Sequence, residues 1–235
     1  MIREAIVLAG GKGERLKEAV GDLPKPMAPI NERPFLEYQL DYLDKWGIQR
    51  VVLSVGYKSD KIIAHFGESY KSMEVVYSVE DEPLGTGGAI KKAFGYIKGH
   101  AAFILNGDTY FDVNLQRVND FRWIKETDTV IVLRYEDNVN RYGEVEFDTN
   151  NKIIRFAEKS GNDKEGYING GVYLITKSYF NSFDLPEKFS IETDFFRKYC
   201  NEEEFYGIRC FSYFRDIGVP EDYEKAQDEF KRLVY

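Results

Sequence analysis

Short apolar runs alternate with amphipathic segments in the first half of the chain. The runs are rich in Val, Ile and Leu, which is typical of buried strands, and they lie at Ala5–Leu8, Val51–Val55, Val75–Val79 and Ala102–Leu105. The segments between them carry apolar residues at helical spacing and predict helices at Phe35–Trp46, Lys61–Phe66 and Ala89–Ile97. This alternation predicts a doubly wound α/β fold with a mostly parallel, mixed sheet and helices on both faces.

Strands dominate the second half of the chain. They are predicted at Val130–Tyr135, Glu144–Phe147, Ile153–Ala157, Tyr167–Ile175 and Phe205–Cys210, and a last helix is predicted from Pro220 to Leu233. We expect these strands to extend the sheet and to form one wall of a pocket. The chain has no internal repeat and no change of composition that marks a linker, so we expect one domain over residues 1–235.

Composition narrows the class of protein. A net charge of −8 argues against a broad nucleic-acid-binding face, although a single nucleotide needs only a few local cations. No apolar run is long enough to span a membrane, and the N-terminal residues do not resemble a signal peptide. Cys200 and Cys210 are too few for a disulfide framework or a zinc site, which favours a reduced, cytoplasmic protein.

A glycine-rich turn follows the first predicted strand directly, as Gly10-Gly11-Lys12-Gly13. Glycines there let backbone N–H groups approach phosphate oxygens closely, although a tight strand-to-helix turn explains them equally well. A dinucleotide fingerprint is excluded because Leu16 stands where it needs a third glycine, and the chain has no Gly-Lys-Ser/Thr for a P-loop.

Further polar motifs follow other predicted strands, where open α/β sheets bind their ligands. Three prolines stiffen the stretch around Lys25, which suits a cation that must meet a phosphate. Asp108 follows an apolar strand and a glycine, a position that suits a divalent cation such as Mg²⁺. The remaining motifs are Leu84-Gly85-Thr86-Gly87-Gly88, Glu158-Lys159, Asn169-Gly170-Gly171 and Asp216-Ile217-Gly218.

Seven motifs in a fixed order together resemble those of the sugar-1-phosphate nucleotidyltransferases, also called nucleotide-sugar pyrophosphorylases. They are LAGGKGERL, PKPMAPI, LGTGGA, NGD, EK, NGG and DIG, and the resemblance extends from Ile6 to about Tyr223. Within that family, the stretches PKPMAPI, EDEPLGTGGAI, LNGDTYFD and DIGVPEDY are most similar to bacterial D-glycero-α-D-manno-heptose 1-phosphate guanylyltransferases.

The resemblance implies a Rossmann-like fold with a strand-rich sugar-binding portion, and an in-line transfer of a nucleotidyl group. The phosphate oxygen of a sugar 1-phosphate attacks the α-phosphorus of a nucleoside triphosphate, and pyrophosphate leaves without a covalent enzyme intermediate. Catalysis then depends on positioning and on charge neutralisation. The chain agrees with this, because its two histidines, His65 and His100, do not indicate a nucleophile triad.

The resemblance also implies a role for each matching residue. Arg15 would bind the β- and γ-phosphates, Lys25 the α-phosphate and Lys159 the phosphate of the sugar, while Asp108 and Asp216 would hold Mg²⁺. The remaining nucleotide contacts would come from Leu8, Ala9, Gly10, Gly11, Gly13 and Gly85, and the sugar contacts from Gly143, Glu158 and Asn169.

Glu80 bears on the choice of base, because it lies five residues before Gly85, where relatives that use thymidine or uridine often carry Gln. Guanine presents two adjacent donors, N1–H and N2–H₂, and a carboxylate can accept both, whereas an amide cannot. Glu80 therefore favours GTP. The alternative interpretation is a solvated acidic turn formed with Asp81 and Glu82.

The identity of the sugar rests on the resemblance alone. Mannose 1-phosphate guanylyltransferase and N-acetylmuramic acid 1-phosphate uridylyltransferase stay open as alternatives, and so does a sensor of nucleotide-sugars without catalysis. Such a sensor would be expected to lack some of the residues that bind phosphate or metal. This chain retains them all, which favours an enzyme: Arg15, Lys25, Asp108, Lys159 and Asp216.

Overall fold

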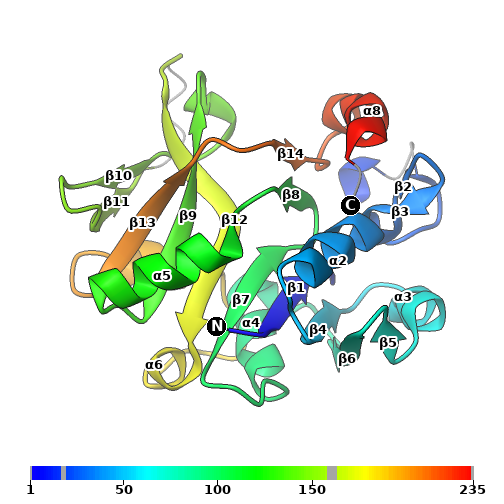
Figure 1. Cartoon of the computed structure of the whole chain (residues 1–235), viewed down its shortest axis with the longest axis horizontal. Coiled ribbons are helices and arrows are strands. Elements are labelled where there is room, and N and C mark those ends of the chain that lie inside the picture. The colour runs from blue at the N-terminus through cyan, green and yellow to red at the C-terminus, as the bar shows by residue number, and fades with distance from the viewer. Residues whose placement is uncertain (1, 17–19, 158–162, 234–235) are drawn as a thin grey trace.

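A computed structural model describes residues 2–16, 20–157 and 163–233. Its centre is an eight-stranded sheet in the order β13-β9-β12-β7-β1-β4-β6-β5 (Figure 1). Neighbouring strands are parallel except where β12 pairs with β7 and β9 and where β5 pairs with β6, so the predicted mostly parallel, mixed sheet is confirmed. The strands are β1 (Glu4–Leu8), β4 (Arg50–Val55), β5 (Ser69–Tyr70), β6 (Met73–Val79), β7 (Ala101–Asn106), β9 (Thr129–Glu136), β12 (Gly166–Thr176) and β13 (Phe205–Cys210).

Helices cover both faces of this sheet, as the alternation of elements predicts. Successive side chains of β1 point to opposite faces, so Val7 packs in one buried cluster and Ile6 in another. The Val7 cluster includes residues of α2 (Phe35–Lys45), α3 (Ser59–Phe66), α5 (Leu115–Lys125) and α8 (Pro220–Glu229). The Ile6 cluster includes residues of α4 (Gly85–Phe94), α6 (Lys177–Asn181) and the π-helix Ile191–Phe196, which continues into α7 (Arg197–Tyr199).

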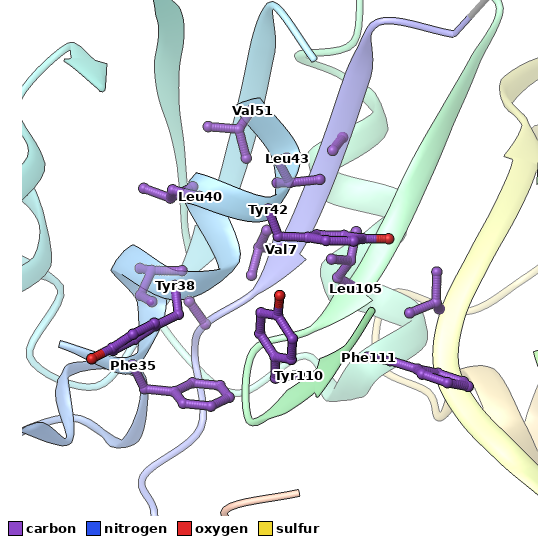
Figure 2. Packing of buried hydrophobic residues seen from close by; sticks show 14 of the residues in the cluster. Val7, Phe35, Tyr38, Leu40, Tyr42, Leu43, Val51, Leu105, Tyr110 and Phe111 are labelled. Carbon is purple, nitrogen blue, oxygen red and sulfur yellow. The ribbon is translucent and has the colours of Figure 1, made fainter. Parts of the chain in front are cut away.

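The apolar residues that predict helix α2 are the ones that it buries. Its apolar side chains Leu40 and Leu43 belong to the same buried cluster as Val7 of the sheet (Figure 2). Full burial of one such side chain contributes about 1.5–3 kcal/mol. Tyr42 packs edge-on against Tyr110, with ring centroids 5.9 Å apart, and its hydroxyl donates to a buried backbone carbonyl. The helix therefore packs against both the sheet and the segment that follows β7.

Within the part of the chain that the structure describes, three short antiparallel ribbons lie outside the central sheet, and one of them joins the two halves of the chain. This ribbon pairs β8 (Thr109–Phe111) with β14 (Phe214–Asp216), which lie side by side in Figure 1. The other two pair β10 (Val145–Phe147) with β11 (Ile153–Phe156) and β2 (Pro29–Ile30) with β3 (Arg33–Pro34). The β8–β14 ribbon carries residues from distant parts of the sequence to the same edge of the fold.

The structure corrects several predicted elements. Helix α4 begins at Gly85 rather than Ala89 and ends at Phe94, so the glycines of the LGTGGA motif form its first turn. The last helix ends at Glu229 and is followed by the 3₁₀ turn Phe230–Arg232. Helix α5 and strands β8 and β14 do not follow from the pattern. In α5 the reason is plain, because Ile124 is 76% exposed while Arg122 is buried, and apolar and polar residues do not separate by face.

The state of the cysteines and the character of the helices bear on the cellular location expected from the sequence. Cys200 and Cys210 are both free thiols. No helix among the described residues combines the length and the apolar character that crossing a membrane requires.

Candidate active site

The carboxyl ends of β1, β6 and β7 surround a cavity of about 290 Å³ together with the first turn of α4. Because neighbouring parallel strands end at the same edge of a sheet, segments distant in sequence meet there. Its lining includes predicted nucleotide-binding residues from four separate segments, namely Leu8, Gly10, Gly11, Lys25, Glu80, Gly85 and Asp108.

A second cavity of about 340 Å³ adjoins the first and shares Gly11, Lys25 and Asp108 with it. It is also lined by Lys12, Gly13, Arg15 and Gly218. Two of these side chains, Lys12 and Arg15, are exposed cations beside bare glycine backbone. A polyanion that extends from the first cavity into the second would meet positive charge there.

Close backbone approach explains the glycines at the end of β1. A side chain on Gly10 would come within 2.8 Å of Glu80 Oε1, and one on Gly13, which has a positive φ of 65°, would collide with Lys25. Ala9 lines neither cavity, and its N–H donates to the carbonyl of Ser54 at 2.7 Å. Of the predicted glycines in this loop, Gly11 alone faces open space.

The Glu80 side chain is held at the wall of the first cavity. Its Oε1 accepts a hydrogen bond from the Ser54 hydroxyl at 3.1 Å, and its Oε2 accepts one from the Leu84 N–H at 3.0 Å. Glu80 is therefore held at the cavity wall and is half-buried, whereas Asp81 and Glu82 of the same turn are exposed. A carboxylate has about four acceptor positions, so each oxygen keeps one for a ligand.

Lys25 and Asp108 lie where the two cavities meet, and Asp216 is near both of them but lines a separate cavity of about 420 Å³. The Lys25 ammonium forms an ion pair with Asp108, and Lys25 is only 8% exposed. Asp216 lies opposite Thr109 in the β8–β14 ribbon, and Ile217 donates its N–H to the Asp108 carbonyl at 2.9 Å. Burial raises the pKa of Asp216, and the charge of Asp108 raises it further, while Lys25 opposes the shift.

Two residues that the sequence did not reveal hold these charged residues in place. Gln39, which is 1% exposed, donates from Nε2 to the carbonyls of Asn106 and Thr109 at 2.7 and 2.8 Å, on either side of Asp108. Arg215 forms ion pairs with Glu229 and Asp222 of α8 and so fixes the strand that ends at Asp216. The sequence signal for Gln39 was its position among the apolar residues of α2.

The first turn of α4 packs against residues 187–189. Side chains on Gly85, Gly87 or Gly88 would collide with Phe189 or with the carbonyl of Glu187, and Gly85 also has a positive φ of 72°. The N–H of Gly87 donates to the Phe189 carbonyl at 2.9 Å. The glycines therefore let residues 187–189 pack closely against α4, and Gly85 also lines the first cavity.

The predicted sugar-binding residues divide into two groups. Glu158 and Lys159 lie outside the described residues. Asn169 lies in β12, where its Oδ1 accepts from the Gly171 N–H at 3.0 Å across a bulge and its Nδ2 donates to the Tyr173 hydroxyl at 2.8 Å. Gly143 packs so closely against Ala157 that a side chain there would lie 2.8 Å from the Ala157 carbonyl oxygen.

The family model described as nucleotidyl transferase matches residues 4–232. This chain belongs to the nucleotidyl transferase family. The resemblance drawn from the seven motifs is thereby confirmed at the level of the family.

Two relatives of this nucleotidyl transferase match nearly its whole length. It is 46% identical over 231 residues to the D-glycero-alpha-D-manno-heptose 1-phosphate guanylyltransferase of Aneurinibacillus thermoaerophilus, covering 98% of this chain and 100% of the relative. It is 45% identical over 222 residues to the enzyme of the same name from Campylobacter jejuni, covering 94% and 96%. The crystal structure of HddC from Yersinia pseudotuberculosis in complex with GMP-PN has a TM-score of 0.86, at 38% identity, and covers 97% of this chain and 100% of that one.

Asp108 and Asp216 are the candidate metal ligands of this nucleotidyl transferase. No group of three or more His, Cys, Asp or Glu side chains gathers for a metal within the described residues. Asp108 lies at the junction of the two cavities, and Asp216, which lines neither of them, is near enough for the charge of Asp108 to contribute to its raised pKa. Two carboxylates fit a cation that takes its other ligands from phosphates and water, which is the usual mode for Mg²⁺.

Proposed function

We propose that this nucleotidyl transferase moves guanosine monophosphate from GTP to D-glycero-α-D-manno-heptose 1-phosphate and releases pyrophosphate. The observation that carries this proposal is the identity of 45–46%, over nearly the whole chain, to two guanylyltransferases of that name. The products are a GDP-heptose, the form in which a sugar is ready for transfer, and pyrophosphate. Such a reaction belongs to nucleotide-sugar biosynthesis for cell-surface polysaccharides, in the cytoplasm.

The choice of guanine is supported by Glu80. Each of its oxygens already accepts one hydrogen bond, from Ser54 or from Leu84, and keeps one acceptor position toward the cavity. Two parallel acceptors match the N1–H and N2–H₂ donors of guanine. Uracil and thymine present one donor between two acceptors, so a carboxylate there would face an oxygen.

Positively charged side chains bind the phosphates and neutralise their charge during the nucleotidyl transfer. Arg15 binds the β- and γ-phosphates in the second cavity. Lys25 exchanges its ion pair with Asp108 for one with the α-phosphate, where negative charge accumulates. A sugar phosphate oxygen bonds to the α-phosphorus while the bond from that phosphorus to the β-phosphate oxygen breaks. The electron pair leaves with pyrophosphate, so no residue of the chain is covalently modified.

Asp108 and Asp216 would hold Mg²⁺. When bound, the cation neutralises phosphate charge beside the reacting centre. The chain contributes the positions of the two carboxylates, which the β8–β14 ribbon and Gln39 fix before substrate arrives. Preorganisation of this kind spares the active site a rearrangement at the moment of reaction.

The sugar 1-phosphate is assigned to the region of Gly143, Glu158, Lys159 and Asn169. Lys159 binds its phosphate, while Glu158, Asn169 and the backbone at Gly143 bind its hydroxyls. Asn169 supports this assignment, since its amide is already held by Tyr173 and Gly171. The side chain therefore needs no reorientation to meet a hydroxyl.

Pyrophosphate release from a matrix of substrates tests the proposal. GTP, ATP, UTP and dTTP are each combined with D-glycero-α-D-manno-heptose 1-phosphate, mannose 1-phosphate and N-acetylmuramic acid 1-phosphate, in Mg²⁺. The highest kcat/KM is expected for GTP with the heptose. A higher value for mannose 1-phosphate would overturn the sugar, and a preference for UTP would overturn the base. No turnover with any pair would overturn the enzymatic proposal and favour a sensor.

A further inference from the structure

Ser54 is a buried polar residue near the carboxyl end of β4. It is 0% exposed and does not itself line the first cavity. In the sheet it pairs with Leu8 of β1 on one side and with Ser78 of β6 on the other (Figure 1). Paired residues of neighbouring strands point to the same face of a sheet, and Leu8 lines the cavity. The Ser54 side chain therefore lies on the cavity side of the sheet.

The Ser54 hydroxyl is one of two donors that hold the Glu80 carboxylate. It donates to Oε1 at 3.1 Å, and the Leu84 N–H donates to Oε2 at 3.0 Å. The backbone of Glu80 is fixed as well, because its N–H donates to the Val55 carbonyl at 2.7 Å. Gly10 packs so closely over Oε1 that a Cβ atom there would lie 2.8 Å away. Each carboxylate oxygen thus has a donor of its own.

These donors matter because a glutamate side chain alone does not set the plane of its carboxylate. The last torsion of glutamate is broad and roughly two-fold, so its orientation has to come from its surroundings. Guanine recognition depends on that plane, since the N1–H and N2–H₂ donors lie side by side in the plane of the base. One donor from β4 and one from the turn before α4 restrict the Glu80 carboxylate before a nucleotide binds. Such preorganisation lowers the entropic cost of binding.

We propose that Ser54 is a positioning residue for recognition of the base, because its hydroxyl holds the Glu80 carboxylate in the plane in which both oxygens accept from guanine. This inference rests on the proposed function, in which Glu80 binds guanine. Without the hydroxyl, Oε1 loses its donor and the carboxylate can rotate about its remaining hydrogen bond to Leu84. Glu80 then no longer meets both guanine donors at once. Ser54 does not line the cavity, so its effect on the base passes through Glu80.

Ser78 on the neighbouring strand provides a matched comparison. It pairs with Ser54 in the sheet and is also 0% exposed. Its hydroxyl has no hydrogen-bond partner within the described part of the chain, whereas that of Ser54 bonds to Glu80. The two serines therefore share residue type, burial and register, and they differ in their contact with the carboxylate. Substitution of Ser78 by alanine controls for the loss of a buried hydroxyl at this end of the sheet.

Steady-state kinetics with GTP and ITP test the proposal, each with D-glycero-α-D-manno-heptose 1-phosphate in Mg²⁺. ITP keeps the N1–H of guanine but lacks the N2–H₂, so the ratio of the two kcat/KM values reports the second hydrogen bond. In the wild type, a hydrogen bond to a charged acceptor is expected to favour GTP roughly tenfold or more. In Ser54→Ala this ratio should fall by at least about threefold, while KM for the sugar 1-phosphate stays within about twofold.

Two further variants accompany this measurement. Ser54→Cys keeps a weak S–H donor, so its GTP:ITP ratio should lie between those of the wild type and Ser54→Ala. It also carries the test if the alanine variant does not fold. Ser78→Ala should keep the wild-type ratio, because its hydroxyl does not contact Glu80.

A double-mutant cycle separates positioning from general structural support. Ser54→Ala is introduced alone and together with Glu80→Ala, which removes the carboxylate that Ser54 holds. If Ser54 acts through Glu80, the added substitution leaves the GTP:ITP ratio of Glu80→Ala unchanged. A fall of the same size in both backgrounds would show that Ser54 supports the cavity as a whole, and would overturn the inference.

The outcomes distinguish this inference from the proposed function. If the wild type prefers GTP to ITP and the Ser54 variants keep that preference, the inference alone is overturned. A wild type that uses ITP as well as GTP also overturns it, since Glu80 then does not bind both donors, while transfer from GTP stands. If the wild type prefers UTP to GTP, the proposed base falls and the inference falls with it. A reduced ratio that is confined to the Ser54 variants and absent from the Glu80→Ala background supports the inference.

Discussion

The backbone N–H of Ile217 donates to the carbonyl oxygen of Asp108 at 2.9 Å, across 108 intervening residues. This hydrogen bond continues the β8–β14 ribbon, in which Thr109 faces Asp216. The side chains of Asp108 and Asp216 consequently lie at the same end of the ribbon, beside Lys25. The two acidic motifs that the sequence predicts are thus brought together by local backbone pairing.

Asp108→Asn is expected to reduce pyrophosphate release at least a hundredfold, because it removes a charge from the proposed site for Mg²⁺ and the phosphates. The assay is turnover of GTP with the heptose 1-phosphate in Mg²⁺. Asp112→Asn is the control, since Asp112 lies four residues further along and pairs with Lys45 at 3.7 Å. Near-normal turnover of Asp108→Asn would rule out its assignment.

Asp216→Asn is expected to stabilise the substrate-free protein at neutral pH. The folded-state pKa of Asp216 is raised, so its ionisation costs stability as the pH rises through that pKa, and an uncharged Asn avoids this cost. The melting temperature of the variant should exceed that of the wild type at pH 7, and the difference should vanish well below the ordinary aspartate value of 3.8. Added Mg²⁺ with GTP should stabilise the wild type more than the variant. A variant that melts lower than the wild type at pH 7 contradicts the prediction.

Lys159→Ala is expected to weaken binding of the sugar 1-phosphate and to spare the nucleotide, because the proposed function assigns the triphosphate to Lys25 and Arg15. Calorimetric titration of GTP and of the sugar 1-phosphate measures both affinities separately. Lys164→Ala serves as the control, because Lys164 pairs with Glu144 instead. A variant that loses GTP binding but keeps the sugar phosphate would show the two roles to be reversed.

Glu80→Gln is expected to lower kcat/KM for GTP and to raise it, relatively, for UTP or dTTP. The amide places a donor against a guanine donor, which costs about 1–3 kcal/mol, or roughly tenfold to a hundredfold in binding. Glu82→Gln is a suitable control because Glu82 is exposed on the same turn. An unchanged ratio of GTP to UTP efficiency would show that base choice lies with another residue.

Gln39→Leu is expected to destabilise the fold and to lower kcat. The substitution keeps the volume close to the original but leaves the carbonyls of Asn106 and Thr109 without their donor, which costs about 1–3 kcal/mol. The loop that carries Asp108 then loses its restraint from α2. Urea unfolding and steady-state kinetics measure the two effects, with Gln116→Leu on the exposed face of α5 as the control. Unchanged kcat in a folded variant would show that the loop holds its own shape.

The strands and helices with a clear pattern of apolar and polar residues were predictable from the sequence. Strand Ala5–Leu8 is buried on both faces and reads as an unbroken apolar run, and helix Phe35–Trp46 has one apolar face. Helix α5 escaped prediction because Trp123 and Ile124 are exposed while Asn119 and Arg122 are buried, which inverts the usual pattern. Strands β8 and β14 are too short to carry a pattern and form only because each finds the other.

The sequence by itself determined the family, the parallel core of the sheet and the motifs at its carboxyl edge, because these depend on local residue patterns and on short ordered stretches. Only the tertiary structure decided which of those motifs touch. It set the Glu80 carboxylate against Gly10 at the cavity wall, joined Asp216 to Asp108, and brought Glu192 beside Asn169. The physical reason is that each contact depends on how distant segments pack and pair, and no local pattern of polar and apolar residues encodes a pairing between segments so far apart along the chain.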